Sequence, residues 1–527
     1  MINRHAFGVG VIVTLTAIGL TACGQQAQPT SSEDVSVSFS NIAETTSLDP
    51  AIVSSSDGLE FVRNVYDSLT QYEVGGTEVE PSIAESWETN EDSSVYTFHL
   101  RDDITFHDGT DLTADDVVAS IERVQAINQG FASLITGIES VTATDDTTVV
   151  IELSAPDVYL PGKLQKIAIV SADAIEENAT DEDPWAQDWF AENEAGSGPY
   201  QLDEWDKGTS IELSAFDDYY LDWEEGTPTQ VSLRTDTDVQ TALQLLEQGE
   251  IDMMGAVGPD ESAAAADMDG VKLIEQSALS VKTLPLNVNN EALSDVRVRE
   301  AISLAFDYEA MNEYYEGYAE TSVGPLPSGF GDGIEDLAPN EQDVERAKEL
   351  LAEAGYGDGL TLTYMGVSGL SYEEFTGTLL EQNLADIGIT LEINMVPWAQ
   401  MVELQSDPAT AADITFLDMS AVSDDPSAML AQEFLSSDIA SEGGYNWSYY
   451  QNTELDDAIT SLSAITDEDE RNQAVLDTVD MINSEYLAIY ATQPSLAQPV
   501  LEKWDVQYEP MDYNYVVRFF YARDTSA

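Results

Sequence analysis

The stretch TFHLRDDITFHDGTDLTADDVVASIERV, residues 97–124, decides the fold class because it joins a strand pattern directly to a helix pattern. Apolar Phe98 and Leu100 alternate with polar neighbours, which is the period-two pattern of a half-buried strand. The Asp108-Gly109 pair then predicts a tight turn. Thr113 is suited to cap a helix, and acids follow it in the first helical turn, where they are favoured.

The same succession of strand and helix patterns continues on both sides of this stretch, without an internal repeat. We expect further strands at 35–39, 148–153, 166–171, 210–215, 229–234, 251–254, 360–365, 389–396 and 413–417, and in a tail of short strands to Tyr521. We expect further helices after an N-cap at Asp57 and at 239–248, 295–315, 343–356, 372–387, 455–464 and 468–486. The sequence therefore predicts a mixed α/β protein of several lobes.

Composition indicates a folded, strongly acidic protein. Of 527 residues 43% are hydrophobic, and 100 Asp and Glu stand against 18 Lys and Arg, for a net charge of -82. Such charge weakens a compact state at low salt, whereas near 1 M salt the Debye length falls to about 3 Å. We interpret the charge as halophilic adaptation to a salty exterior; acidic drift without a role for salt is the alternative. Nucleic acid is excluded as a partner, since the chain has no basic patch to meet phosphates.

The N-terminus has the features of a secretory signal. Arg4 and His5 precede a 17-residue apolar run, 6–22, and Cys23, the single cysteine of the chain, follows it. The tetrapeptide ending at Cys23 resembles a bacterial lipobox, which implies cleavage before Cys23 and attachment of lipid (palmitate) to it. We expect a signal peptide at 1–22, a flexible tether at 23–34 and a lipid-anchored protein on the outer face of the cytoplasmic membrane, at the cell surface or in the periplasm. A plain membrane anchor is the alternative, although the run is short for a span of about 20 residues.

Catalytic and metal-binding patterns are weak. Among three histidines, His107 with Asp108 could form half of a metal site, but one cysteine and few histidines leave no usual ligand set. Neither GxSxG nor HExxH occurs. A carboxylate pair such as Asp424-Asp425 is expected by chance among 100 acids. We predict no catalysis, no metal and no cofactor; a secreted acidic hydrolase that uses such a pair is the rival from another class.

Several segments, in this order, closely resemble the peptide/nickel-type family (family 5) of ABC-transporter extracellular solute-binding proteins. The resemblance spans about residues 35–521. The segments are Ser47–Tyr72, AESW at 84–87, TFHLR at 97–101, FHDGTDLTADDVVAS at 106–120, GSGPYQLDEW at 196–205, DVRVREAISLAFD at 295–307, AKELLAEAGY at 347–356, LADIGI at 384–389 and YNWSYYQNTELDDAI at 445–459.

The resemblance implies a three-lobed, periplasmic-binding-protein-like α/β fold of the class II type. Domain I would comprise 35–70, 171–275 and 495–527, domain II would be an insertion at 71–170, and domain III would comprise 276–494. The ligand would lie in a cleft between domains I and III, with hinge crossovers near 281–287 and 491–498. The implied function is capture of a solute by a monomer and its delivery to the permease subunits of an ABC importer by hinge closure; a pure sensor on the same fold is a further rival. His107 would belong to the scaffold of domain II.

The resemblance also implies the ligand contacts. Two backbone segments would hold an extended peptide as an added strand, namely Ser54, Ser55 and Ser56, and Asp418, Met419, Ser420, Ala421 and Val422. Trp398 and Trp447 fall in segments that line the cleft, with ordinary core packing as the alternative.

The charged anchors of peptide binders are missing here. Val422 stands where they have an aspartate for the ligand ammonium, and the loop 365–371 has no arginine for the ligand carboxylate. Asp418, Asp424 or Asp425 could replace the amine anchor. A peptide is therefore the first candidate for the cargo, and an oligosaccharide or another polar solute is the alternative.

Overall fold

The structure, a computed structural model, describes six stretches of the chain, and these belong to one compact unit, Asp34–Ala527. They are residues 35–41, 43–277, 279–330, 333–442, 444–507 and 516–526. The predicted signal peptide and tether, with Cys23, lie outside the described residues. Within the described stretches no helix has the length and apolarity needed to cross a membrane.

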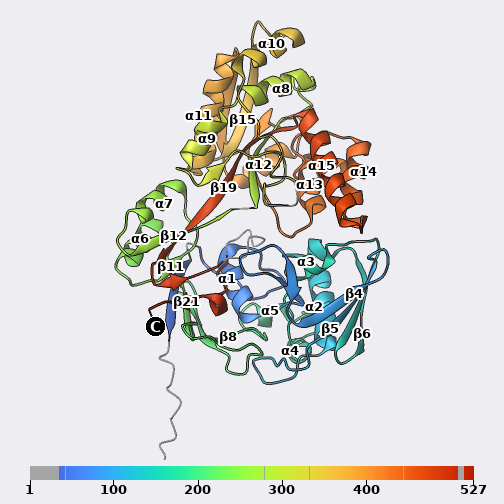
Figure 1. The fold of residues 1–527 in the computed structure, drawn as a ribbon, viewed down its shortest axis with the longest axis vertical. Coiled ribbons are helices and arrows are strands. Elements are labelled where there is room, and N and C mark those ends of the chain that lie inside the picture. The colour runs from blue at the N-terminus through green and yellow to red at the C-terminus, as the bar shows by residue number, and fades with distance from the viewer. Residues whose placement is uncertain are drawn as a thin grey trace, which may run out of the picture. The chain divides into compact units, whose positions relative to one another are not determined.

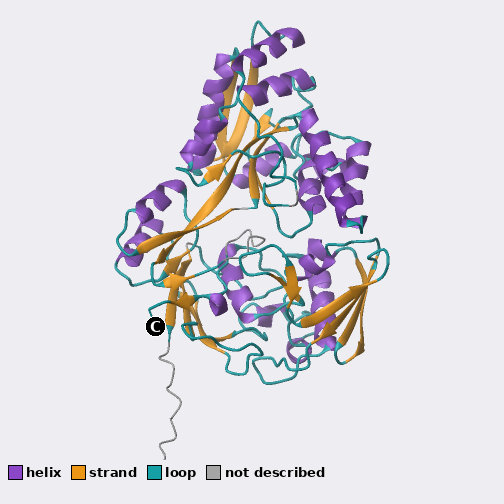
Figure 2. Ribbon diagram, in the orientation of Figure 1, coloured by secondary structure: helices purple, strands orange, loops and turns teal. Residues whose placement is uncertain are grey.

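The largest sheet extends from the lower part of the unit into its upper part, along the diagonal strand β19 (Figures 1 and 2). Its strand order is β18-β13-β19-β11-β1-β10-β9-β8, and β12 and β14 also pair with β19. The strands are β1 Ser36–Asn41, β8 Tyr200–Asp206, β9 Ser210–Ala215, β10 Gln230–Thr235, β11 Met253–Met254, β12 Val271–Ser277, β13 Ser280–Pro285, β14 Ala319–Glu320, β18 Leu417–Ser420 and β19 Ala488–Leu501.

Strand β19 connects two halves of the described unit. We call residues 35–275 and 495–526 the lower lobe and residues 280–494 the upper lobe, after their places in Figure 1. The first half of β19 pairs with β13 of the upper lobe, and its second half pairs with β12 and β11. Two crossings, at β12–β13 and at β19, therefore join the lobes, which is the arrangement that a hinge requires.

The lower lobe contains a four-stranded antiparallel sheet in the order β4-β5-β7-β6, covered by α2. The predicted cap of α2 is confirmed, since Thr113 and Asp116 form a reciprocal capping box. The remaining elements are α1 Ser56–Val65, β2 Thr70–Tyr72, β3 Val79–Pro81, β4 Ala84–Thr89, β5 Val95–Leu100, α2 Ala114–Ile127, β6 Ile138–Asp145, β7 Thr148–Leu153, α3 Leu160–Leu164, α4 Ala172–Asn178, α5 Gln187–Phe190, α6 Val239–Glu247, α7 Pro259–Ala266, β20 Trp504–Asp505 and β21 Arg523–Asp524.

The upper lobe has two groups of helices, which Figure 1 shows on either side of its strands. A parallel sheet, β16-β15-β17, packs with α8, α10 and α11, and α13, α14 and α15 form the second group. The bounds are α8 Val296–Ala305, α9 Tyr308–Tyr314, α10 Val344–Ala354, β15 Leu360–Val367, α11 Ser371–Asp386, β16 Ile389–Val396, α12 Trp398–Gln405, β17 Ile414–Thr415, α13 Pro426–Phe434, α14 Thr453–Ser461 and α15 Glu468–Glu485.

Two predictions in the lower lobe differ from the structure. Residues 166–171 form no strand, and only an isolated bridge joins Ala168 to Ser68. Their apolar side chains are buried by tertiary packing, which gives the same pattern as a strand. Ser55, not Asp57, is the N-cap of α1, so that Asp57 lies inside the first turn.

Three further predictions were wrong in the upper lobe. The single helix predicted at 295–315 is two, because the Asp307 side chain accepts from the Ala310 N–H and starts α9 afresh. The strand predicted at 413–417 is divided between β17 and β18. The expected tail of short strands begins instead with the 14-residue strand β19.

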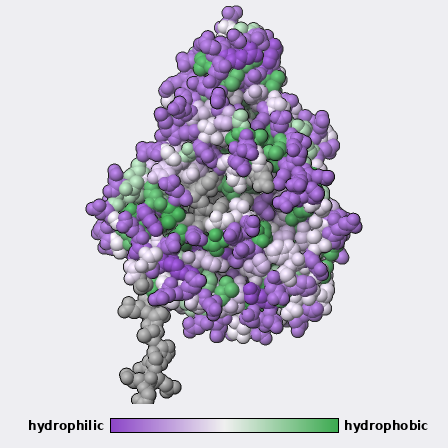
Figure 3. Space-filling view, in the orientation of Figure 1, coloured by the Kyte–Doolittle hydropathy of each residue, from purple (hydrophilic) through white to green (hydrophobic). Residues whose placement is uncertain are grey.

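The surface reflects the acidic composition. Figure 3 shows hydrophilic residues over most of the face in view, with apolar residues in smaller groups. A net charge of -82 on such a surface makes electrostatic repulsion a significant term in stability.

Candidate functional site

A cavity of about 650 Å³ lies between the two lobes and is lined by residues of both. The lower wall includes Ser56, Asp57 and Glu60 from the first turns of α1, and the upper wall includes β18 and the start of α12. This volume lies in the range of pockets that enclose small organic solutes. We therefore take this cavity as the candidate ligand site.

The lower wall depends on the loop that precedes α1. Ser54, Ser55 and Ser56 are exposed there, but only Ser56 lines the cavity. Buried Asp49 holds the start of this loop, since its carboxylate accepts from the Ala51 N–H at 3.0 Å.

The upper wall is built on the pairing of β18 with β13. Asp418, Met419 and Ser420 on β18 line the cavity, as does Val422 just after the strand. Ala421 is buried, and its N–H donates to the Leu279 carbonyl at 2.8 Å. Within the described residues β18 is an edge strand of the sheet, and an edge strand is what a peptide needs to add itself by main-chain hydrogen bonds.

Aromatic rings cover one end of the cavity. Trp398 and Tyr445 line it with exposed fractions of 45% and 42%, whereas Trp447 is only 2% exposed. The Trp398 and Trp447 rings stack with centroids 5.8 Å apart. Trp398 therefore faces the cavity, and Trp447 packs against it as part of the core.

The upper wall holds a cluster of polar and charged side chains in which Asp418 was predicted from the sequence, whereas Lys282, Tyr372 and Glu373 were not. Lys282 of β13 donates from Nζ to Asp418 Oδ2, and its Nζ lies 5.6 Å from the centroid of the Tyr372 ring. Burial raises the pKa of neighbouring Glu373 to about 7, although the hydrogen bond that its carboxylate accepts from the Val367 N–H acts to lower this pKa. The sequence signal was slight: a single lysine in the apolar strand pattern VKTLP.

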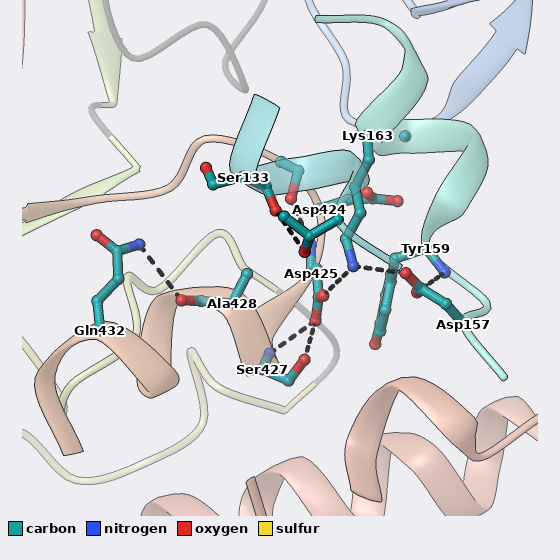
Figure 4. A network of polar contacts seen from close by, with 12 residues as sticks. Ser133, Asp157, Tyr159, Lys163, Asp424, Asp425, Ser427, Ala428 and Gln432 are labelled. Atoms are coloured by element: carbon teal, nitrogen blue, oxygen red, sulfur yellow. Dashed lines mark hydrogen bonds and ion pairs between the residues drawn. The ribbon is translucent and has the colours of Figure 1, made fainter. Parts of the chain in front are cut away.

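Outside the cavity, a second polar cluster joins the lobes (Figure 4). We call Asp157, Lys163 and Asp425, with Asp424 and Tyr72, the Lys163 cluster. Lys163 Nζ lies 2.7 Å from Asp157 Oδ2 in the lower lobe and 2.7 Å from Asp425 Oδ2 at the start of α13 in the upper lobe. The cluster thus links α3 to α13 by charge.

Asp424 completes this contact. The Tyr72 hydroxyl accepts from the Asp424 N–H at 3.0 Å and lies 3.1 Å from Asp424 Oδ1. Burial raises the pKa of the Asp424 carboxyl to about 7. A Cβ atom at Gly162 would overlap Asp424 Oδ1, so the lobes meet closely here.

The three carboxylates predicted as an amine anchor or a catalytic pair, Asp418, Asp424 and Asp425, do not all lie in the cavity. Asp424 and Asp425 belong to the contact between lobes and do not line the cavity, whereas Asp418 does. His107 is held by Glu194 and the Gly198 carbonyl, each 2.9 Å from a ring nitrogen, and is also absent from the lining. Among the described residues no group of three or more His, Cys, Asp and Glu side chains is arranged to hold a metal ion.

Replacing Lys163 by methionine should lower the free energy of unfolding by about 2 kcal/mol, because two carboxylates with little access to water lose their cation. Calorimetric melting at constant salt measures the change. Lys348→Met, which breaks an exposed pair with Glu345 on α10, is the matched control and should cost less than about 0.5 kcal/mol. Equal losses in the two variants would contradict a structural role for the Lys163 cluster.

Comparison with known proteins gives a consistent result. Residues 78–441 match the sequence profile of the bacterial extracellular solute-binding proteins, family 5 (middle region). The chain is 27% identical over 473 residues to the dipeptide-binding protein of Escherichia coli K12, covering 83% of this chain and 85% of that protein. It is 27% identical over 437 residues to heme-binding protein A of Haemophilus influenzae, covering 78% of each.

Solved structures show the same fold. The binding protein DppA of Helicobacter pylori, in complex with the peptide STSA, has a TM-score of 0.76 and 25% identity over 93% of this chain and 98% of its own. The ABC transporter substrate-binding protein CtaP of Listeria monocytogenes has a TM-score of 0.82 and 23% identity over 94% of this chain and 100% of its own.

Proposed function

Because the chain belongs to the bacterial extracellular solute-binding proteins of family 5, we propose that it captures a small peptide in the cavity between its lobes and delivers it to an ABC import permease by hinge closure. The family role is binding for transport and not catalysis. An oligosaccharide or another polar solute is the alternative cargo. One relative, heme-binding protein A, is named for a ligand that is not a peptide, which keeps a non-peptide cargo open.

The observation that carries this proposal is the cavity itself. Its walls come from two lobes that β19 and the β12–β13 crossing connect, and its upper wall includes β18, an edge strand among the strands that the structure describes. An edge strand can pair with the backbone of a peptide whatever its side chains are. We assign direct contacts to Ser56, Trp398, Asp418, Met419, Ser420 and Val422, and supporting roles to Ser54, Ser55, Ala421 and Trp447.

The test is to identify the solute that the protein carries. Purification without denaturation, followed by soft-ionisation mass spectrometry, should release a peptide or another polar solute in a one-to-one ratio. Added back to stripped protein at a hundred times its Kd, this solute should raise the free energy of unfolding by about 2.7 kcal/mol. It should be recovered intact. Turnover of peptide or glycoside substrates that is lost on replacing Asp424 or Asp425 would instead support the hydrolase.

We also propose that lipid on Cys23 holds the mature protein at the outer face of the cytoplasmic membrane. The Cys23→Ala precursor should then escape lipidation and cleavage and lose at least about nine-tenths of its label from a radioactive fatty acid, since the chain has no other cysteine. Undiminished labelling of the Cys23→Ala protein would refute the anchor. A Ser31→Ala variant in the predicted tether, which leaves the cysteine intact, is the control.

A further inference from the structure

Lys282 is placed where its charge decides what the upper wall of the cavity can bind. It occupies β13 with an exposed fraction of 9%, directly opposite Asp418 in the strand register, and both residues line the cavity. Among the described residues that line the cavity, Lys282 is the one lysine or arginine. Its Nζ donates to Asp418 Oδ2, so the charges of the two side chains already balance.

A lone carboxylate in such a wall would be a site for a ligand ammonium, because charge-assisted hydrogen bonds are the strong ones. The Asp418 side chain keeps an exposed fraction of 42% and is thus within reach of a solute. Its partner, however, is attached to the neighbouring strand and competes at the high effective concentration of an intramolecular group. An incoming amine would have to displace that partner.

The displaced Lys282 would find no equal partner nearby. The centroid of the Tyr372 ring lies 5.6 Å from Lys282 Nζ, and Glu373 is 4% exposed, with a carboxylate that already accepts from the Val367 N–H at 2.6 Å. Burial raises the pKa of that carboxyl to about 7, so a negative charge there already carries a desolvation cost. Leaving an ammonium with little water and no full counter-charge is costly.

We propose that Lys282 is a specificity-determining residue, a built-in ammonium that occupies Asp418 and makes the upper wall select uncharged hydrogen-bonding groups over a free amine. Blocked peptide termini and sugar hydroxyls have this chemistry. The inference rests on the proposed function, since it concerns the solute that the cavity holds. The acids of the lower wall, Asp57 and Glu60, are left unchanged in every variant below and so cancel in the comparison.

The test uses the stripped, full-length protein with two probes, trialanine and N-acetyl-trialanine, and isothermal titration. The wild type should bind trialanine no more tightly than its acetylated form. Lys282→Met should lower the Kd of trialanine about tenfold, because Asp418 becomes available to the amine, and should change the Kd of the acetylated probe less than about twofold. Lys348→Met, the same substitution on exposed α10, should change neither.

A double variant, Lys282→Met with Asp418→Asn, decides where the amine binds and removes any concern that an unpaired carboxylate harms folding. It should lose the gain for trialanine. A gain that persists in the double variant, or a wild type that already prefers the free amine with a ratio unchanged by Lys282→Met, overturns the inference while leaving solute binding intact. Absence of a gain because no variant binds either probe overturns it too. Failure of the proposed function is read separately, as the absence of any carried solute in the mass spectrum.

Discussion

The Arg123→Met protein should unfold with a free energy about 4 kcal/mol below that of the wild type, since removing one partner of a buried ion pair leaves the other charge uncompensated. Arg123 on α2 donates from Nη1 and Nη2 to the two carboxylate oxygens of Asp49, at 2.6 and 2.8 Å. The two side chains are 1% and 0% exposed. The Arg123 guanidinium also donates to the Trp185 carbonyl at 2.9 Å and lies 4.2 Å from the centroid of the Phe190 ring.

This loss should extend to ligand binding, because Asp49 holds the loop that leads to α1 and the lower wall of the cavity. Calorimetry of the stripped protein gives the stability, and titration with the identified solute gives the affinity. Arg346→Met, which removes an exposed pair on α10, is the matched control and should cost less than about 0.5 kcal/mol.

A second variant tests whether the uncompensated charge is the cause. Adding Asp49→Asn to Arg123→Met removes the buried carboxylate and should recover a large part of the lost stability. If the double variant is as unstable as, or less stable than, Arg123→Met alone, then packing of the guanidinium, and not its charge, is what stabilises this contact.

Removal of salt should lower the melting temperature by on the order of 10 °C, because the net charge of -82 makes the carboxylates repel one another across the whole unit. Between about 1 M and about 0.01 M salt the Debye length grows from about 3 Å to about 30 Å, so that distant carboxylates begin to repel one another. Local pairs such as Lys163–Asp425 become stronger over the same range, but the 18 cations of the chain are too few to offset 100 acids.

Calorimetric scans over a salt series measure this effect at constant pH. Sodium and potassium chloride at equal ionic strength should give equal melting temperatures, which distinguishes screening from the binding of one particular ion. A melting temperature that is independent of salt would reject the proposal that the acidic surface is an adaptation to a saline exterior.

Much of the fold followed from local sequence patterns. Alternation predicted β5, β7 and β16, and the Thr113 cap predicted the start of α2, because a strand's faces and a helix's first turn depend on residues only a few positions apart. The sequence did not predict the break between α8 and α9, since Asp307 is acceptable inside a helix as well as at its start.

For the site, too, the sequence predicted some features and only the tertiary structure decided the others. The sequence by itself determined the family resemblance and the acidic composition, and it predicted some of the segments that line the cavity, β18 and the Trp398 region among them. Only the tertiary structure decided that Lys282 meets Asp418, 136 residues away, and that Trp398 faces the cavity while Trp447 lies behind it. With 100 carboxylates and 18 cations, no local pattern can tell which charges meet, because such pairs depend on how strands and lobes come together in space.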